Sequence, residues 1–184
     1  MAILPIYTYG DEVLNKVAKP LKKVDEKVQT LIDDMFETME QANGIGLAAP
    51  QVGVSVRLLV VDVSCVKEYK HVPPMVIINP QILETRDEVL MEEGCLSIPG
   101  VREEVWRPDV IKLKYRDRNF QEHIEEFDGL LSRVIQHELD HLNGELFVEK
   151  LDSKKRRSLK EALEAIKHGE VEAKYVLAEK SHVA

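Results

Sequence analysis

The chain has 184 residues, 44% of them hydrophobic and 32% charged, which fits one globular domain with a substantial core. The net charge of −8 argues against DNA or membrane binding through overall charge, and no apolar stretch is long enough to span a bilayer. Two cysteines make no disulfide framework, and the N-terminus has no signal-peptide pattern. These features favour a cytoplasmic enzyme or binding domain.

The first clear element is a helix from Val24 to Gly44. Apolar residues recur at helical spacing from Val28 to Met39, Asp25 suits the N-cap, and Asn43-Gly44 can end the helix. The next ten residues, GIGLAAPQVG (44–53), contain three glycines and a proline. They predict a loop, although one that is unusually apolar.

Strand signals fill the middle of the chain. Residues 56–63 are dense in β-branched side chains, and residues 75–80 read as a second strand that ends at Pro80. Residues 81–94 suggest a hairpin around Arg86-Asp87. Residues 110–117 alternate apolar and polar side chains, and a turn at 116–119 predicts pairing with 120–127.

Two further helices are predicted, from Asp128 to Gly144 and from about 152 to 169, followed by a tail at 170–184. Gly144 suits the C′ position of the first of these helices. Because helices and strands do not alternate as βαβ units, the sequence favours an α+β fold in one catalytic domain, residues 1–184.

The stretch QHELDH (136–141) places two histidines four residues apart with a glutamate after the first. On a helix, His137 and His141 leave the same side one turn apart and can reach one metal ion. Glu138 would flank that ion without binding it, which suits a base acting on water. Taken alone, the motif is as consistent with polar residues on an amphipathic helix.

A catalytic metal site of this kind usually has a third protein ligand, and the spacing leaves its identity open. The metzincin pattern fails because Phe147 stands where its third histidine should be. A thermolysin-type site would use Glu161 or Glu164, although both follow a basic run on what reads as a surface helix. Cys95, in EEGCLSIPG, is a chemically suitable ligand, and it reads equally well as a buried core thiol.

Three segments in order, GIGLAAPQVG, EEGCLSIPG and QHELDHLNG, resemble the signature motifs of the bacterial-type peptide deformylases. The pattern between them is similar to that family from about residue 3 to residue 150. The resemblance implies antiparallel strands packed around a central helix that carries HExxH, and it implies Cys95 as the third ligand beside His137 and His141. Family members remove the formyl group from N-formylmethionine on nascent chains with one divalent metal ion. Iron(II) is the expected native metal, with zinc, nickel or cobalt as possible occupants.

The same resemblance implies roles around the metal. Glu138 would take a proton from water and return it to the leaving amine, while the Gln51 amide and the backbone N–H of Leu96 would form the oxyanion hole. The peptide would lie beside the backbone of 44–47, with Gly46 closest, and its methionine would enter an apolar pocket. The residues implied in substrate binding are Gly44, Ile45, Gly46, Leu47, Met91, Arg102, Arg133 and Val134.

Two of these residues have alternatives. Arg133 is polar where several relatives carry an apolar residue, so only its carbon stem would line the pocket. Arg102 would orient the Cys95 loop or contact the peptide, or it would form a surface ion pair with Glu103 or Glu104. The basic run at 154–157 is either a solvated helix face or a surface that docks on ribosomal RNA.

Two other functions compete with the deformylase reading. One is an HExxH metallopeptidase that cuts internal peptide bonds. The other is a structural metal domain, whose site would be closed by a fourth protein ligand. No fourth ligand stands out near the motifs, which disfavours the structural domain.

Overall fold

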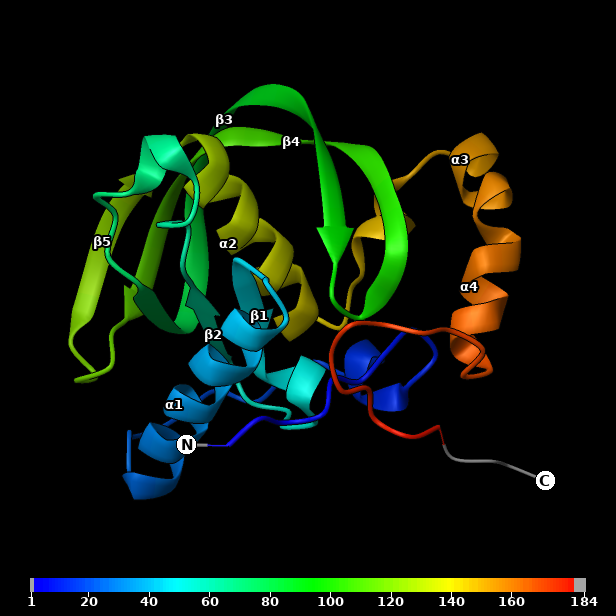
Figure 1. Cartoon of the computed structure of the whole chain (residues 1–184). Coiled ribbons are helices and arrows are strands. Elements are labelled where there is room, and N and C mark those ends of the chain that lie inside the picture. Colours follow the sequence, from blue (N-terminus) through cyan, green and yellow to red (C-terminus); the bar gives the residue numbers. More distant parts are fainter. Residues whose placement is uncertain (1, 181–184) are drawn as a thin grey trace.

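The computed structural model describes residues 2–180, and its centre is a five-stranded antiparallel sheet with helices on both faces (Figure 1). The strands lie side by side in chain order. Their bounds are β1 Gly46–Ala48, β2 Leu58–Val61, β3 Met75–Cys95, β4 Ile98–Arg116 and β5 Glu122–Phe127. The expected α+β class with antiparallel strands is therefore confirmed, as is the hairpin that joins 110–117 to 120–127.

Helix α1, Glu26–Gln41, covers one face of the sheet. Its start follows from the sequence, because the Asp25 side chain accepts a hydrogen bond from the backbone N–H of Val28 (3.0 Å) and so caps the first turn. Its buried side chains include Ile32, Met35 and Met39, and they pack with Leu58, Val60 and Ile78 of the sheet.

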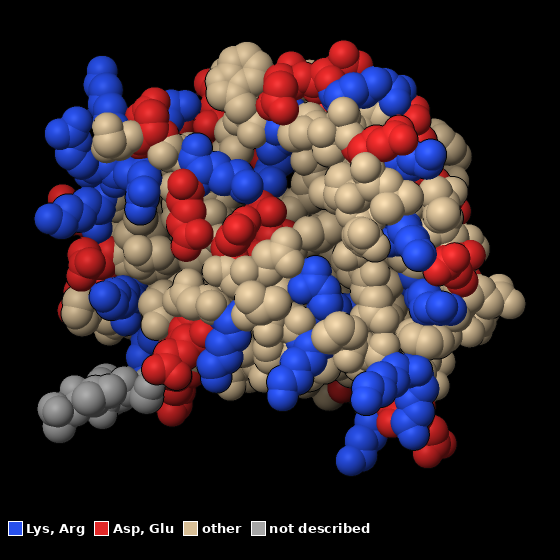
Figure 2. Space-filling view, turned by 180° about the vertical axis from the view of Figure 1, so that it is seen from behind, with Lys and Arg blue, Asp and Glu red and all other residues tan. Residues whose placement is uncertain are grey.

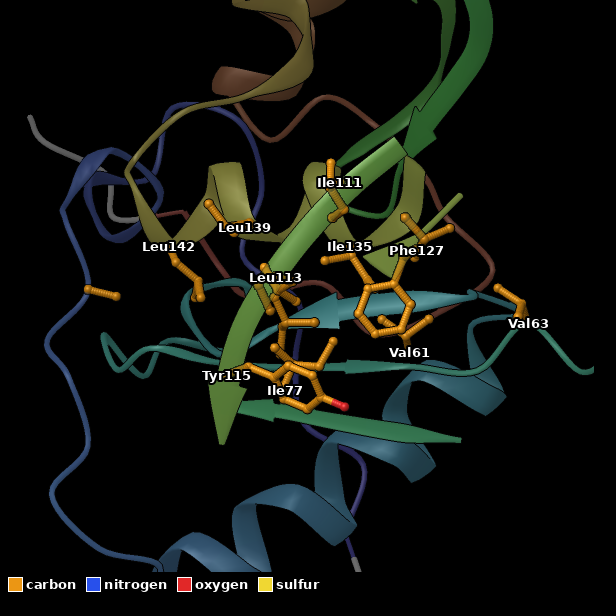
Figure 3. Close-up of a cluster of buried hydrophobic side chains, with 14 residues drawn as sticks. Val61, Val63, Ile77, Ile111, Leu113, Tyr115, Phe127, Ile135, Leu139 and Leu142 are labelled. Atoms are coloured by element: carbon orange, nitrogen blue, oxygen red, sulfur yellow. The ribbon is translucent and has the colours of Figure 1, made fainter. Parts of the chain in front are cut away.

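Helix α2, Gly129–Leu142, lies on the opposite face and carries QHELDH. Figure 3 shows its apolar side chains against those of the sheet: Ile135, Leu139 and Leu142 from the helix, and Val61, Ile77, Ile111 and Leu113 from the strands. Strand β2 is buried on both faces because α1 covers one and α2 the other, which explains its continuous apolar run. Gly144 follows the C-cap of α2 with a φ of 75°, as expected for a C′ glycine.

Strand β3 corrects two expectations. It does not end at Pro80 and makes no hairpin at Arg86-Asp87, but runs on to Cys95. A register shift between Ile78 and Gln81 forms an irregularity around Pro80, where the missing N–H disturbs no regular ladder. As a result, β3 and β4 form one long hairpin that carries Cys95 at its closed end.

The apolar segment 44–53 is also more regular than expected. It contains the short strand β1 and a 3₁₀ helix, η2 (Ala49–Val52), rather than only a loop. Residues 46–52 are buried, because α2 packs against β1 and η2 while α1 packs against β1. The apolar composition that is unusual for a loop is therefore what a buried edge of the sheet requires.

The C-terminal region differs from the single helix expected at 152–169. It forms two helices, α3 (Ser153–Ser158) and α4 (Lys160–Lys167), after a 3₁₀ turn η4 (Phe147–Lys150). Leu163 and Ile166 of α4 pack with the closed end of the β3–β4 hairpin. Two short 3₁₀ turns, η1 (Glu12–Asn15) and η3 (Lys67–Tyr69), complete the described elements.

The tail after α4 returns to the N-terminal segment, and Ile6 and Leu177 form a β-bridge (Figure 1). The expected tail reached residue 184, and its last four residues lie outside the described part of the chain. Among the described helices, none combines the length and the apolar character needed to cross a bilayer.

Candidate active site

Helix α2 places the two histidines side by side in the interior. His137 is 7% exposed and His141 is 1% exposed, and their ring centroids are 5.2 Å apart. This follows from the i, i+4 spacing, which puts both side chains on one side of the helix. The ring of Phe147 lies 5.7 Å from that of His137, so the residue that excludes a metzincin site packs against the histidine pair.

Cys95 reaches the same point from the closed end of the β3–β4 hairpin. Its Sγ lies 3.3 Å from Nε2 of His141, and one ligand atom from each of Cys95, His137 and His141 lies within 4.8 Å of the others. Within residues 2–180, this cluster brings three histidine, cysteine or acidic side chains close enough together to hold a metal ion. Ligands placed tetrahedrally around one zinc-like ion are about 3.5 Å apart, so the cluster is of the right size.

The chemistry of the donors also fits a divalent transition metal. A thiolate and two imidazoles suit zinc or iron(II), and a metal-bound histidine usually donates its other ring N–H to a carboxylate. His137 does so, since its Nδ1 lies 2.8 Å from Oε1 of Glu93, which leaves Nε2 to face the cluster. Nδ1 of His141 is buried without a hydrogen-bond partner among the described residues.

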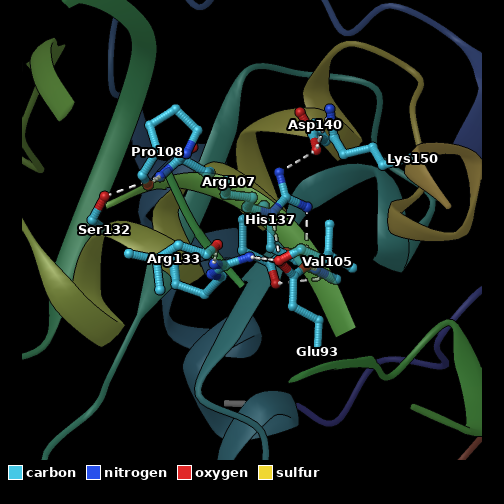
Figure 4. A network of polar contacts seen from close by, with 12 residues as sticks. Glu93, Val105, Arg107, Pro108, Ser132, Arg133, His137, Asp140 and Lys150 are labelled. Atoms are coloured by element: carbon cyan, nitrogen blue, oxygen red, sulfur yellow. Dashed lines mark hydrogen bonds and ion pairs between the residues drawn. The ribbon is translucent and has the colours of Figure 1, made fainter. Parts of the chain in front are cut away.

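Glu93 is the centre of a buried charge network behind His137 (Figure 4). Its carboxylate accepts hydrogen bonds from Arg107 (2.5 and 2.9 Å) and from Arg133 (2.8 Å). Burial alone would raise the pKa of Glu93, but the hydrogen bonds from His137 and Arg107 outweigh it and hold the pKa well below its usual range. Glu93 is therefore ionised and fixed, so it orients the His137 ring.

Arg107 connects this network back to α2. Besides its two bonds to Glu93, its Nη1 donates to Asp140 at 2.7 Å, and its guanidinium is 4% exposed. Asp140 lies on α2 between the two histidines of the motif and His141 follows it directly. The network therefore ties β3, β4 and α2 together at the point where the potential metal ligands meet.

Glu138 lies in the same buried region, and its Oε2 has no hydrogen-bond partner among the described residues. Burial raises the pKa of Glu138 to about 7, and the opposing charge of His137 does not offset that effect. A carboxyl group with such a pKa can exchange a proton readily near neutral pH.

Gln51 enters the site from η2 and is 1% exposed. Its Oε1 accepts a hydrogen bond from the backbone N–H of Ala48 (2.8 Å), which fixes the orientation of the amide. Nε2 therefore points the other way, toward Oγ of Ser97 (3.1 Å) and Sγ of Cys95 (3.6 Å). Leu96 lies between Cys95 and Ser97 in the turn from β3 to β4.

Cys95, His137 and Glu138 border a cavity of about 470 Å³, whereas the buried Gln51 and His141 lie behind its lining. Residues 43–46 form one wall, residues 92–96 the other, and α2 contributes Leu130, Arg133, Val134, His137 and Glu138. The structure thus brings Cys95, Leu96, Ile45, Gly46, Gly44 and Arg102 to one cavity with the α2 residues, as the sequence predicts.

Strand β1 presents a free edge to this cavity. The carbonyl of Ile45 accepts a hydrogen bond from the N–H of Asp62, so the backbone of Ile45 faces the sheet. In an antiparallel pair the next residue faces the opposite way, which directs the N–H and carbonyl of Gly46 toward the cavity. A Cβ at Gly46 would lie 2.7 Å from Val134 and 3.0 Å from Glu138, so glycine is required there.

Of the other residues predicted to bind substrate, one borders the cavity and two do not. Arg133 is tied by its guanidinium to Glu93 and to the carbonyls of Val105 and Val89, which leaves its carbon stem for the cavity. Met91 and Leu47 do not border the cavity, and the Leu47 side chain is fully buried in the core beneath β1.

Arg102 borders the cavity and pairs with Glu92, at 2.5 Å, rather than with either of the two acids that follow it. The alternative reading, an ion pair of Arg102 with Glu103 or Glu104, is therefore wrong in its partner. Both members of the observed pair are more than half exposed, which places them at the mouth of the cavity.

The competing ligands lie elsewhere. Glu161 and Glu164 are exposed on α4 and border a different, shallow surface depression. Cys65 is exposed and lies beyond β2. None of these three belongs to the cluster formed by Cys95 and the two histidines.

Sequence reasoning did not identify Glu93, Arg107, Ser97 or Tyr175, all of which contact or border the site. One signal for Glu93 was available. It precedes Cys95 by two residues on a strand, a spacing that puts two side chains on one face. A carboxylate there is well placed to hold a ligand histidine. Arg107 and Tyr175 are distant in the chain and gave no local signal.

Comparison with known proteins agrees with this geometry. A family model for polypeptide deformylases matches residues 3–157. A peptide deformylase of Chlorobium luteolum is 62% identical over 176 residues, which cover 96% of this chain and 93% of the relative. One from Chlorobaculum tepidum is 55% identical over 176 residues, with 96% and 94% covered.

Solved structures give the same result. A peptide deformylase from Legionella pneumophila matches with a TM-score of 0.83 at 44% identity, covering 90% of this chain and 96% of the other. One from Ehrlichia chaffeensis, in complex with actinonin, matches with a TM-score of 0.83 at 41% identity and covers 94% and 100%. With the three motifs folded around one cavity, these matches over most of the sequence mean that the chain belongs to the polypeptide deformylase family.

Proposed function

We propose that the cavity beside α2 is where this protein removes the formyl group from N-formylmethionyl nascent peptides. As a deformylase, the protein is a metal-dependent hydrolase of a linear amide, and its products are formate and a free N-terminal methionine. The observation that carries the proposal is the cluster of Cys95, His137 and His141 near Glu138, whose Oε2 has no hydrogen-bond partner among the described residues.

Cys95, His137 and His141 would hold one divalent cation. When bound, the cation would acidify water in the site and polarise the formyl carbonyl. We infer iron(II) as the native ion, as the family resemblance implies, with zinc, nickel or cobalt as substitutes that the same donors accept. Metal analysis of protein purified without oxygen tests this assignment, and zinc as the main metal in such a sample would contradict it.

Glu138 serves as the base and then the acid. Its Oε2, which no described residue contacts by a hydrogen bond, accepts a proton from the attacking water and returns it to the nitrogen of the leaving methionine. Nε2 of Gln51 and the N–H of Leu96 donate hydrogen bonds to the formyl oxygen, where negative charge develops. The fixed amide of Gln51 supports this role, because its orientation is set before substrate arrives.

The peptide would pair with the free edge of β1 along residues 44–47, and its main chain would lie closest to Gly46. Ile45, Val134 and the carbon stem of Arg133 form the apolar surroundings for the methionine side chain. Arg102, at the mouth of the cavity, would contact the peptide beyond the first residue. Met91 is not part of this proposed pocket, since it does not border the cavity.

Purified protein should release formate from formyl-Met-Ala-Ser and leave internal peptide bonds uncut. Formate assays and mass spectrometry of the peptide measure both activities in one sample. Cleavage of casein without deformylation would reject the proposal in favour of a metallopeptidase.

We also propose that the whole chain, residues 1–184, is one catalytic domain that acts in the cytoplasm on chains leaving the ribosome. Lys154, Lys155, Arg156 and Arg157 of α3 offer a basic surface for ribosomal RNA. Figure 2 shows lysine and arginine side chains gathered on the side of the molecule where α3 and α4 lie. Co-sedimentation with ribosomes should weaken as the salt concentration rises. Binding that does not change with salt concentration would contradict this role.

A further inference from the structure

The C-terminal tail, residues 170–180, lies beyond the segment that the family model matches, which ends at residue 157. It pairs with the N-terminal segment through two backbone hydrogen bonds, from the N–H of Ile6 to the carbonyl of Val176 (3.0 Å) and from the N–H of Ala178 to the carbonyl of Ile6 (2.8 Å). The tail is therefore attached to the N-terminal segment by one isolated parallel β-bridge.

Lys180 fastens the end of this pairing. Its ammonium group donates to the carbonyls of Thr8 (3.0 Å) and Tyr9 (2.8 Å) and lies 3.1 Å from the carboxylate of Asp11. The ammonium group is mostly buried, with 11% of the side chain exposed. Three acceptors on one buried lysine fix the position of the tail relative to residues 6–11.

The N-terminal segment to which the tail is fixed also contacts both segments that carry the proposed oxyanion donors. The N–H of Tyr7 donates to the carbonyl of Gln51 (2.7 Å), and the N–H of Tyr9 donates to the carbonyl of Ser97 (2.9 Å). Ser97 directly follows Leu96 in the chain. The N-terminal segment thus lies between the tail and the two donor segments, bonded to each.

Tyr175 gives the tail a direct contact with the site. Its hydroxyl donates to the carbonyl of Leu96 at 2.7 Å, and its side chain borders the catalytic cavity. Burial and the nearby Cys95 raise the pKa of Tyr175 to about 12, so the hydroxyl remains a donor at neutral pH. The carbonyls of Leu96 and Ser97 are therefore both held from outside the β3–β4 hairpin.

We propose that the C-terminal tail, through the hydrogen bond from Tyr175 to Leu96, positions the backbone N–H of Leu96 for the formyl oxygen. Leu96 lies in the turn between β3 and β4, directly after the register shift between Gly94 and Cys95. The backbone hydrogen bonds between the two strands therefore fix it only weakly. The carbonyl and the N–H of Leu96 belong to two neighbouring peptide planes that meet at its Cα. Anchoring the carbonyl therefore limits how far that Cα, and with it the plane that carries the N–H, can move. Tyr175 is a positioning residue in this scheme, and the inference rests on the proposed role of Leu96.

The positioning role of Tyr175 can be distinguished by experiment from a simpler role as a residue that only lines the cavity. A wall residue contacts substrate before and after reaction, so its loss raises KM and weakens product binding. A residue that aligns an oxyanion donor acts on charge that develops in the transition state, so its loss lowers kcat and leaves ground-state binding unchanged. Turnover and binding of the product peptide Met-Ala-Ser, which lacks the formyl oxygen, distinguish these two roles.

The test uses the full-length, metal-loaded protein with Tyr175→Phe, which removes one hydroxyl and keeps the ring. We expect kcat for formyl-Met-Ala-Ser to fall about threefold to tenfold, with KM and the inhibition constant of Met-Ala-Ser within twofold of wild type. Metal content should stay at the wild-type value, and Tm should fall by only about 1–6 °C, as the loss of one neutral hydrogen bond implies. Amide hydrogen exchange at Leu96, measured in the metal-free protein, should become faster.

Lys180→Met provides a second variant, because it loosens the far end of the tail without altering the cavity wall. It should reproduce the pattern of Tyr175→Phe with a smaller loss of kcat. Val176→Ala is the matched control, since its side chain is exposed and its backbone bond to Ile6 is retained. Kinetic constants and exchange at Leu96 should both match wild type in the control.

Two results would overturn the positioning role. One is a Tyr175→Phe protein with wild-type kcat and wild-type exchange at Leu96. The other is a rise in KM and in the product inhibition constant with kcat unchanged, which would make Tyr175 a wall of the cavity only. These failures differ from a failure of the proposed function, in which the wild-type protein itself would release no formate.

Discussion

The α2 side of the cavity is held by buried charges, whereas the Gln51 side is held by neutral hydrogen bonds. On the first side Glu93 accepts from His137, Arg107 and Arg133, all of them almost fully buried. On the second side the Gln51 amide bonds to Ala48 and Ser97.

This difference predicts how each side responds to change. Removing one member of a buried charge network leaves the remaining charges without compensation, which costs about 3–5 kcal/mol for a fully buried pair. Removing one neutral hydrogen bond costs about 0.5–1.5 kcal/mol, so that side can be adjusted in small steps. The buried charge network on the α2 side should therefore contribute more to metal binding and stability than the neutral hydrogen bonds of Gln51 do.

The largest effect is expected from the proposed metal ligands. Cys95→Ala or His141→Ala should lose bound metal and all measurable formate release, because two remaining ligands bind a cation weakly. Metal analysis after gel filtration checks the first effect. Glu161→Gln, on the exposed face of α4, is the control and should keep full metal content. Metal loss in that control would instead favour a thermolysin-type site.

Glu138→Ala should separate chemistry from metal binding on the α2 side itself. Because its Oε2 has no partner among the described residues, the substitution breaks no hydrogen bond made by that atom. We expect metal content to stay at the wild-type level while kcat falls about 10²- to 10⁴-fold, the usual contribution of a general acid–base group. A metal-loaded variant with wild-type turnover would reject Glu138 as the base.

Gln51→Leu tests the neutral side. Loss of one preformed oxyanion donor should lower kcat about 10²- to 10³-fold with metal retained. The backbone N–H of Ala48 also loses its acceptor, so the free energy of unfolding should fall by about 1–3 kcal/mol. Steady-state kinetics and thermal unfolding measure the two effects. Unchanged kcat with lowered stability would make Gln51 a purely structural amide.

Glu93→Gln should give the smallest catalytic loss of this series and the clearest change in metal binding. A neutral amide orients His137 less firmly, so we expect metal affinity or activity to fall about 10- to 100-fold. Arg107 would also lose a charged partner, so Tm should drop. Chelator competition measures affinity. Wild-type affinity with lowered Tm would confine the network to a structural role.

The sequence predicted best where a local pattern decides the structure. Asp25 caps α1 through the N–H three residues later, and Gly144 ends α2 with a positive φ, both as expected. The HExxH spacing brings two imidazoles together because it is set by helix geometry alone. Each of these features depends on residues within one or two turns of each other.

Prediction from the sequence failed where a feature depends on contacts with residues far away in the chain. Pro80 can remain inside β3 because of a register shift against β4, which no local pattern reveals. Glu93, Arg107 and Asp140 lie on three different elements, so spacing gave no sign that they form one network. Spacing also could not choose between Cys95 and a buried thiol, and only the family resemblance did so. The tail contact of Tyr175 with Leu96 spans 79 positions in the chain.

The free edge of β1 sets a limit on what can reach the site. In most proteins such an edge is shielded against unwanted pairing, but here it faces a cavity bounded on its far side by residues 92–96. Only a single chain in extended form can lie between the two walls and pair with Gly46. A formyl group on a terminus already packed into a folded domain would be out of reach. The geometry therefore requires that the N-terminus of the substrate is exposed and extended when it loses its formyl group.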